Sequence, residues 1–292
     1  PTGIGKTSLS LDLAEWLGSP IVSCDSRQFY REMHIGTAAP SSTELDRVPH
    51  HFVGHLSIHD YYSAARFESE VLQLLETALF PQHDTVLMTG GSMLYIDAVC
   101  KGIDDMPDVD PLLRQQLQER WHQEGLQPLL AELERLDPVY AATVDRNNPK
   151  RVLHGLELCL LTGRPYSSFR RQTPKERPFN LIKLCLDMDR KVLYQRIDKR
   201  VEQMMAQGLL EEARGLLPHR GLNALNTVGY KELFAYFDGL CSLDEAVKHI
   251  QFNTHKYARK QLTWFRRDPD YHWFSPDDLP GIKAFLSGDS TL

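Results

Sequence analysis

The chain begins with PTGIGKTSLSLDLAEWLG, residues 1–18, and this stretch decides the fold. PTGIGKT matches the end of the phosphate-binding motif G-x-x-x-x-G-K-[ST], whose leading glycine would fall just before Pro1. The two glycines let backbone N–H groups turn toward a phosphate, Lys6 adds a positive charge, and the Thr7 hydroxyl is placed to bind Mg²⁺. The apolar spacing that follows predicts a helix, whose N-terminus also favours anions. A phosphate-binding loop is therefore predicted, with a chance glycine-rich turn as the alternative.

Composition bounds the remaining possibilities. The 292 residues suffice for one large or two modest domains, and 42% hydrophobic and 25% charged residues are typical of globular proteins. Five scattered cysteines without a C-x-x-C pair favour a reducing cytosol over structural zinc, so we expect a cytoplasmic protein. No apolar run reaches the ~18–20 residues that span a membrane. Because the net charge is −6, a nucleic-acid partner would need a local basic patch.

Apolar runs along the chain predict buried parallel strands at residues 20–24, 85–89 and 179–186. Asp25 follows the first of these strands, and ligands of such sheets bind beyond the carboxyl ends of the strands. Asp25 is thus a candidate site residue, although a cap or turn is the alternative. Gly90, Gly91 and Ser92 follow the second strand and predict either another anion contact or a tight turn.

A helical insertion is predicted between the second and third strands. After an acidic, proline-containing segment, residues 112–123, 127–135 and 148–161 are typical of helices. We therefore predict an α/β fold with a P-loop NTPase-like parallel sheet core and a helical insertion domain. The insertion would span 104–177, and the core 1–103 and 178–292, with an N-terminal strand missing before Pro1. The far end of the insertion is basic, with Arg164, Arg170, Arg171, Lys175 and Arg177.

Four histidines, His50, His51, His55 and His59, lie close together. No cysteine accompanies them and their spacing fits no standard ligand pattern, so we prefer packing or substrate-loop roles to a metal site.

Two further segments carry positive charge. Residues 190–208 predict a helix with Arg196 and Arg200 four residues apart on one side. Residues 254–267 (THKYARKQLTWFRR) contain five basic and three aromatic residues and no acid. This pattern suits phosphates and unstacked bases, although a C-terminal core helix is the alternative.

Taken in order, these motifs resemble one family over nearly the whole chain. They are PTGIGKT, IVSCDSRQFY, IGTAAP, PHHFVGHLSI, YSAARF, TGGSMLY, NNPKRVLHGLEL, TGRP, RIDKRVEQM, GLLEEA, NTVGYKE and YARKQLTWFRRD. Together they resemble the tRNA dimethylallyltransferase family, which transfers a dimethylallyl group to N6 of adenosine 37, next to the anticodon. The family's eukaryotic zinc finger has no counterpart here, which favours a bacterial-type enzyme.

The resemblance implies a role for each matching residue. Asp25 would be the general base, assisted by Lys6 and Arg200. Dimethylallyl diphosphate would bind Thr2, Gly3, Ile4, Gly5, Lys6, Thr7 and Arg200, with Mg²⁺ on Thr7. The anticodon stem-loop would contact Asp25, Ser26, Arg27, Gln28, Ser92, Arg114, Lys150, Arg151, Val152, Leu153, His154, Asn226, Thr227, Val228, Gly229, Tyr230 and Lys231, and the basic segment adds Arg259 and Lys260.

The chain departs from the family pattern at three positions: Ser92 stands where threonine is usual, and His154 and Gly155 lie in a stretch that usually reads R-A-L-E. We expect a monomer that binds tRNA and dimethylallyl diphosphate and no membrane. The alternatives are an isopentenyltransferase acting on free adenine nucleotides, a small-molecule P-loop kinase, and a non-catalytic RNA-binding module. The insertion and the Lys150–Arg151 pair favour tRNA over free nucleotides. The insertion and the basic aromatic segment are not explained by a kinase, and an intact GKT with Asp25 argues against a non-catalytic module.

Overall fold

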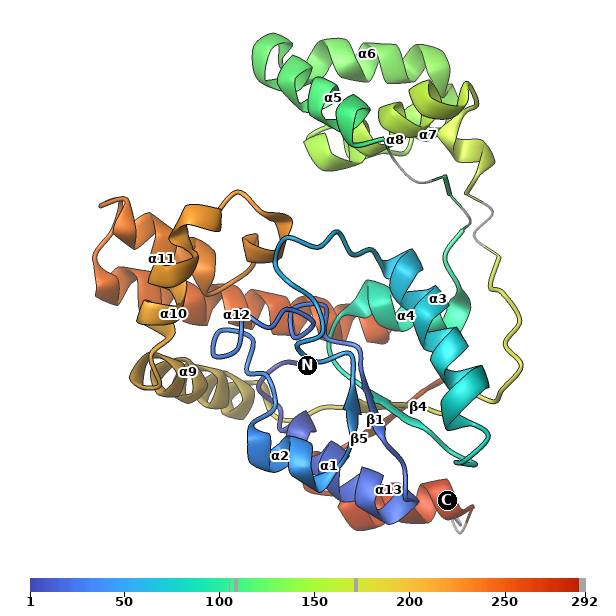
Figure 1. The fold of residues 1–292 in the computed structure, drawn as a ribbon, viewed down its shortest axis with the longest axis vertical. Coiled ribbons are helices and arrows are strands. Elements are labelled where there is room, and N and C mark those ends of the chain that lie inside the picture. The colour runs from blue at the N-terminus through green and yellow to red at the C-terminus, as the bar shows by residue number, and fades with distance from the viewer. Residues whose placement is uncertain (105, 108–109, 171–172, 289–292) are drawn as a thin grey trace. The chain divides into compact units, whose positions relative to one another are not determined.

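The computed structural model describes residues 1–104, 106–107, 110–170 and 173–288 and divides into two units (Figure 1). The core unit comprises Pro1–Cys100 and Arg177–Leu292, and the insertion unit comprises Lys101–Glu176. The insertion predicted from composition ran from 104 to 177. Arg171 of its basic end lies outside the described residues.

Two parallel sheets form the centre of the core unit. In the first, β1 (Ile21–Ser23) lies between β2 (His50–His51) and β3 (Leu87–Thr89). In the second, β4 (Lys183–Leu186) pairs with β5 (Tyr271–Phe274). The α/β class and the three predicted strands are confirmed. The strands β2 and β5 were not predicted, because two histidines and a short aromatic segment carry no apolar run.

Helices surround these sheets in the core unit. Helix α1 packs on β1 and β3, and the long α12 packs on α9 and α11. The others separate the strands along the chain (Figure 1). Their bounds are α1 Lys6–Leu17, α2 Ser42–Arg47, α3 Ala64–Leu74 with the π-helix η1 Leu75–Leu79, α4 Met93–Lys101, α9 Arg190–Ala206, α10 Leu209–Leu216, the 3₁₀ turns η3 Leu217–His219 and η4 Asn223–Leu225, α11 Tyr230–Phe237, α12 Leu243–Phe265 and α13 Leu279–Ser287.

The insertion unit is helical in its described part, as predicted. It contains α5 (Pro111–Glu124), α6 (Leu126–Leu136), α7 (Pro138–Ala141), α8 (Pro149–Thr162) and the 3₁₀ turn η2 (Tyr166–Ser168). Leu129, Leu133 and Leu156 are completely buried between these helices. The buried carboxylate of Asp137 accepts hydrogen bonds from the backbone N–H groups of Tyr140 and Ser167, at 3.0 and 2.6 Å. The unit thus has a hydrophobic core of its own.

The linker that re-enters the core unit is fixed by a buried arginine. Arg177 donates hydrogen bonds to the carbonyl oxygens of Ala98 and Val99 at the end of α4, each at 2.8 Å. It also pairs with Glu68 of α3 at 2.7 Å, and both side chains are less than 9% exposed. Arg177 was counted with the basic end of the insertion, but its charge is buried and paired with Glu68 in the core unit.

The histidine-rich segment serves mainly for packing. His55 contacts the rings of Phe29 and Phe52 edge-on, and His59 contacts His219 in the same way. Burial lowers the pKa of His55. No group of three or more His, Cys, Asp or Glu residues in the described ranges could hold a metal ion.

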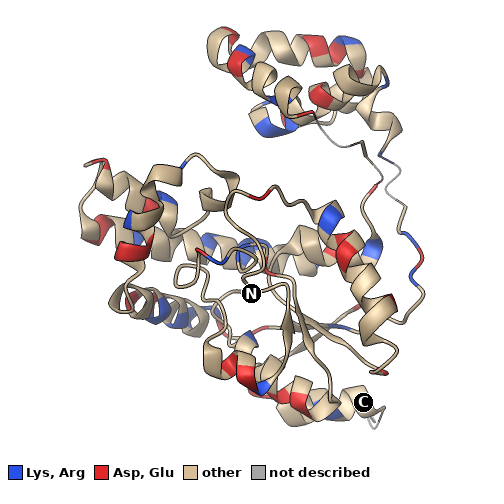
Figure 2. Cartoon of the chain, viewed as in Figure 1, with Lys and Arg blue, Asp and Glu red and all other residues tan. Residues whose placement is uncertain are grey.

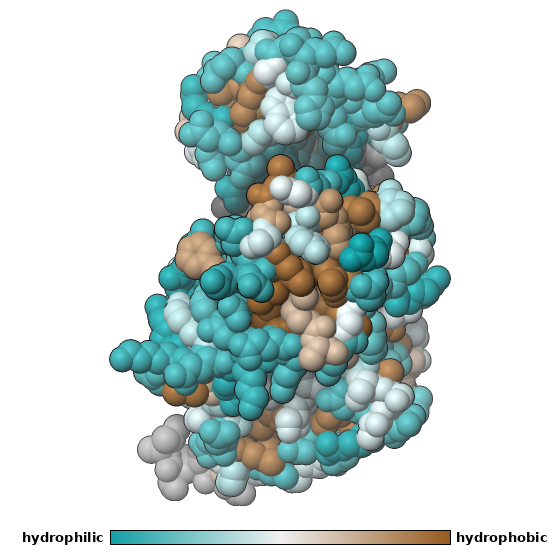
Figure 3. All heavy atoms as spheres, turned by 90° about the vertical axis from the view of Figure 1, so that its left-hand side faces the viewer, coloured by the Kyte–Doolittle hydropathy of each residue, from teal (hydrophilic) through white to brown (hydrophobic). Residues whose placement is uncertain are grey.

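The surface turned to the viewer in Figure 3 is mostly hydrophilic, and hydrophobic patches lie among the hydrophilic residues. Among the helices of the described chain, none has the length and apolar character needed to cross a membrane.

An aromatic cluster lies within the hydrophobic core of the core unit, and it yields a stability prediction. Phe67 is completely buried and stacks on Phe29 with the ring centroids 5.3 Å apart. Phe67→Ala should lower the free energy of unfolding by about 3–5 kcal/mol, because it removes this contact and leaves a cavity. Phe252→Ala is the control: this ring is 52% exposed, so its loss should cost less than about 1 kcal/mol. Denaturant unfolding of both variants would contradict the prediction if the two costs were equal.

Candidate functional site

The predicted phosphate-binding loop lies directly before α1. Gly3 has φ 78° and Gly5 has φ 103°, values that favour glycine. A Cβ atom at Gly3 would lie 2.6 Å from Cγ1 of Ile197, and one at Gly5 would lie 2.8 Å from Nη2 of Arg196. The loop therefore needs glycine for both its conformation and its close contact with α9. Ile4 is completely buried in the hydrophobic core, so only its backbone can contribute to an anion site.

Lys6 and Thr7 are the first residues of α1, and the N-terminus of this helix faces a cavity that both residues line. The ammonium group of Lys6 donates a hydrogen bond to the carbonyl oxygen of Pro1 at 2.8 Å. Burial lowers the pKa of Lys6 to about 8; nearby Asp25 opposes this shift, and Arg200 adds to it. Burying the ammonium disfavours its charged form, and an anion bound beside it would restore that form.

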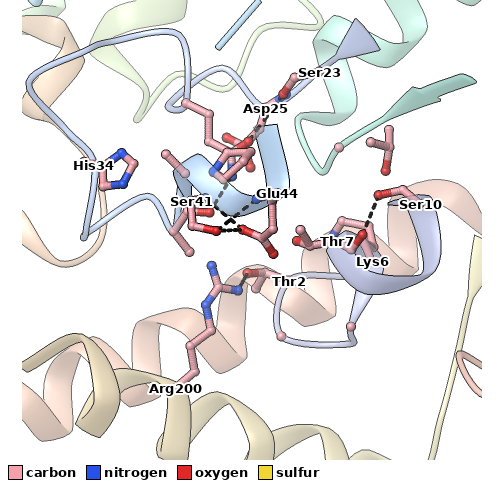
Figure 4. A pocket seen from close by; sticks show the side chains of 18 of the residues that line it. Thr2, Lys6, Thr7, Ser10, Ser23, Asp25, His34, Ser41, Glu44 and Arg200 are labelled. Atoms are coloured by element: carbon pink, nitrogen blue, oxygen red, sulfur yellow. Dashed lines mark hydrogen bonds between the residues drawn. The ribbon is translucent and has the colours of Figure 1, made fainter. Parts of the chain in front are cut away.

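Helix α9 brings two arginines to the same loop. Arg200 donates a hydrogen bond to the Thr2 hydroxyl at 3.2 Å, and Figure 4 shows its side chain reaching toward Thr2. Burial lowers the pKa of Arg200, while Asp25 raises it. Arg196 lines the same cavity. Lysine and arginine residues recur along α9 and α12 (Figure 2).

Two cavities meet at this site. The first, of about 830 Å³, is lined by the phosphate-binding loop, the residues after β1, α9 and the segment 34–41. The second, of about 500 Å³, is lined by residues after β1, the segment 226–232, α9 and α12. The two cavities share Thr2, Asp25, Arg200 and Met204. One carboxylate therefore faces both spaces.

Asp25 lies two residues after β1, where the sequence predicted a site. One of its carboxylate oxygens, Oδ1, accepts a hydrogen bond from the backbone N–H of Arg27 at 3.1 Å. The ends of β1 and β3 are joined by a hydrogen bond from the Cys24 N–H to the Thr89 carbonyl at 2.8 Å. Ser92 accepts a hydrogen bond from the Ser26 N–H at 2.8 Å. The residues that follow the two strands thus lie together, as expected for neighbouring parallel strands.

The second cavity collects many of the residues predicted to bind tRNA. Asn226, Thr227, Val228, Gly229 and Lys231 line it, together with Asp25, Ser26, Arg27, Ser92 and Lys260. Gln28 lines the first cavity instead, and Arg259 is exposed on α12 without lining either.

Two predicted tRNA contacts need correction. Tyr230 is completely buried, and its ring contacts Gly36. Val152 is completely buried in the insertion unit. Neither side chain has a surface that RNA could touch, so both residues support the fold instead. Both lie on helices, where one residue faces the core while its neighbours face solvent.

The other predicted contacts of the insertion unit lie on α8 and α5. Lys150 and Arg151 are exposed in the first turn of α8, and Leu153 and His154 are half-buried. Arg114 forms a bidentate ion pair with Glu157, with nitrogen–oxygen distances of 2.9 and 3.0 Å. Burial of the Glu157 carboxylate acts to raise its pKa, but hydrogen bonds from His154 and Arg114 outweigh this effect and lower the pKa. Arg114 would therefore have to share its charge between Glu157 and a phosphate.

The residues of the first cavity fit a magnesium–diphosphate pair. Thr7 and Asp25 both line this cavity and offer the oxygen ligands that Mg²⁺ prefers. Magnesium usually takes only one or two ligands from the protein and completes its shell with phosphate and water.

Sequence reasoning missed Gln261, which joins the phosphate-binding loop to the glycine turn after β3. Its amide oxygen accepts from the Thr2 N–H and its amide nitrogen donates to the Gly91 carbonyl, both at 2.7 Å. Gln261 is 1% exposed. A polar residue on the buried stripe of α12, next to Leu262, is the signal that could have found it.

Known proteins were then compared with this chain. The family model described as IPP transferase matches residues 28–268. A tRNA dimethylallyltransferase 2 of Porphyromonas gingivalis is 60% identical over 98% of this chain and 95% of its own length. One of Parabacteroides distasonis is 58% identical over 98% and 96%. The chain belongs to the bacterial tRNA dimethylallyltransferase (IPP transferase) family.

The fold agrees with that of a solved member of this family. The full-length tRNA isopentenylpyrophosphate transferase of Bacillus halodurans superposes with a TM-score of 0.71 at 34% identity, covering 99% of this chain and 93% of that one. The resemblance drawn from the ordered motifs is confirmed.

The lowered pKa of Lys6 predicts how diphosphate binding depends on pH. Below about pH 8 the group is positively charged, and above it the charge is lost. Affinity for inorganic diphosphate, measured by calorimetry, should therefore fall as the pH rises from 7 to 9.5. Lys6→Arg is the control, because arginine stays charged over this range. An equal fall in wild type and Lys6→Arg would remove Lys6 from the explanation.

Proposed function

We propose that the chain transfers a dimethylallyl group from dimethylallyl diphosphate to N6 of adenosine 37, next to the anticodon of tRNA. The products would be N6-isopentenyladenosine and diphosphate. The observation that carries this proposal is the position of Asp25, which lines both cavities. A donor in the first and an adenine in the second would both lie beside this carboxylate.

The first cavity suits the leaving diphosphate. We assign the diphosphate to the backbone of the phosphate-binding loop, Lys6, Thr7 and Arg200, because a P-loop NTPase-like loop and two buried cations favour an anion. As the bond to the allylic carbon breaks, negative charge gathers on the diphosphate, and preorganised positive groups stabilise it. Mg²⁺, held by Thr7 and the diphosphate, would neutralise further charge when bound.

Asp25 is the proposed general base. The amino group of adenine is a weak nucleophile, because its lone pair is delocalised into the ring. A carboxylate that removes the N6 proton while the carbon–nitrogen bond forms would overcome this, and such assistance is typically worth ~10²–10⁴-fold. The hydrogen bond from the Arg27 N–H to Oδ1 orients the carboxylate for this step.

The second cavity and the basic side chains around it suit RNA. Lys231, Lys256 and Lys260 line the cavity, so phosphates can be neutralised close to the adenine. Adenosine must leave the base stack to reach Asp25, which costs a few kcal/mol that such contacts offset. We assign further tRNA contacts to Lys150 and Arg151 on the insertion unit. A monomer in the cytoplasm remains our prediction.

The alternatives receive less support. The related proteins named above are tRNA enzymes, which speaks against free adenine nucleotides as acceptors. A small-molecule kinase would leave unexplained the second, lysine-lined cavity. Incubation with unmodified tRNA, dimethylallyl diphosphate and Mg²⁺, followed by mass analysis of the nucleosides, tests the proposal. Transfer to AMP but not to tRNA would overturn it.

Asp25→Asn tests the general base. The amide keeps the shape of the side chain but cannot take a proton, so the rate of transfer should fall by ~10²–10⁴-fold. Far-UV circular dichroism should show a folded protein, because the residue is only half-buried. The thermal midpoint should fall, because Asp25 compensates the charges of Lys6 and Arg200. Asp12→Asn, at an exposed carboxylate on α1 that pairs with Arg47, is the matched control and should keep its rate. Turnover near the wild-type value in Asp25→Asn would reject the assignment.

The contribution of α12 to tRNA binding is tested by salt dependence. Each neutralised phosphate releases counterions, so log K should fall with log salt by roughly 0.7–0.9 per contact. Replacing Arg259 and Lys260 by alanine should weaken tRNA binding and reduce this slope by up to about two units. Calorimetry should show unchanged binding of inorganic diphosphate. Replacing the exposed pair Arg190 and Lys191 by alanine is the control. If both double variants kept the wild-type slope, α12 would lie outside the tRNA site.

A further inference from the structure

The segment 34–41 forms a wall of both cavities. His34, Ile35, Ala38, Ala39, Pro40 and Ser41 line the first cavity, and Gly36 and Thr37 line the second. Ala38 has φ 47°, a left-handed conformation that is unfavourable for a residue with a Cβ atom. Contacts from outside the segment must therefore hold it in place.

The Gln28 amide donates to the carbonyl oxygens of Thr37 and Ala38 at 3.2 and 2.9 Å, and the carboxylate of Glu212, on α10, holds the first half of the segment. Its Oε2 accepts from the backbone N–H groups of His34 and Ile35, at 3.0 and 2.7 Å. Its Oε1 accepts from the N–H of Gly36 at 2.8 Å and from the Tyr230 hydroxyl at 2.7 Å. Four donors converge on a single side chain that touches neither cavity. A charged acceptor makes each of these hydrogen bonds stronger than a neutral one would.

Tyr230 contacts both Glu212 and the segment 34–38 from the side of the second cavity. It lies between Gly229 and Lys231, which line that cavity. A Cβ atom at Gly36 would lie 2.6 Å from Cζ of the Tyr230 ring, so the segment packs directly on the ring. Glu212 and Tyr230 thus connect the wall of the donor cavity to the residues that border the acceptor cavity.

We propose that Glu212, with Tyr230, is a positioning residue that sets the distance between the prenyl donor and the adenine. This inference rests on the proposed function. Glu212 acts through the segment 34–38 rather than by touching a substrate. If the segment moved, each substrate would still bind, but the reacting atoms would lose their alignment. A misplacement of ~1 Å in such an arrangement costs about 10²-fold in rate.

Glu212→Gln is the central test. Glutamine has the same shape, but its NH₂ group cannot accept from the N–H and O–H donors that face it. We expect kcat to fall ~10–100-fold, while the dissociation constants of tRNA and inorganic diphosphate change less than about threefold. The number of active sites is counted from the stoichiometry of diphosphate binding. Partial unfolding would lower this number and leave kcat per site unchanged, whereas a loss of positioning would lower kcat per site. Glu211→Gln, an exposed carboxylate next to it on α10, is the matched control.

Tyr230→Phe keeps the proposal testable if Glu212→Gln does not fold. It removes one of the four donors and retains the ring against Gly36, so a smaller loss of kcat, ~3–10-fold, is expected. In the Glu212→Gln background the same change should add little, because both act through one carboxylate. Wild-type values of kcat per site in both single variants, with wild-type enzyme active on tRNA, would overturn the positioning role alone. An inactive wild type would instead count against the proposed function.

Discussion

The structure depends on two cations held next to a carboxylate. Lys6 and Arg200 are both partly buried, and Asp25 raises the pKa of each against the effect of burial. Burying charge is costly unless another charge compensates it. The three residues come from α1, α9 and the segment after β1, so the fold must bring distant parts of the chain together. Two positive charges and one negative charge leave these three residues with a net positive charge, which favours the binding of an anion.

Much of this arrangement could be predicted because it is encoded locally. A glycine-rich loop before a helix specifies an anion site within seven residues, and an aspartate after an apolar run specifies the ligand edge of a sheet. The insertion was recognisable from a change in composition. The loss of apolar runs and the appearance of helical spacing can both be seen in the sequence without knowing which residues are in contact. These predictions needed no contact between distant residues.

The rest could not be predicted, because it depends on such contacts. The hydrogen bond between Thr2 and Gln261 joins residues 259 positions apart. Tyr230 and Val152 lie in motifs that suggest RNA binding, yet both side chains are buried. Helical periodicity alone does not reveal which neighbour in a motif faces the core when the surrounding fold is unknown. For the same reason Arg177, counted with the basic end of the insertion, proved to be buried in contact with α3 and α4.

The geometry around Asp25 explains how one carboxylate can serve two substrates. Within the described part of the chain, hydrogen bonds reach only its Oδ1, so Oδ2 can face the proton that it removes. Because the carboxylate borders both cavities, its charge stabilises the two cations of the first cavity, and in the proposed reaction it would also face the acceptor. Proton removal from adenine would neutralise it, and the cations would then act on the departing diphosphate without opposition. In the proposed reaction, acid–base chemistry and leaving-group stabilisation would therefore be coupled through one side chain.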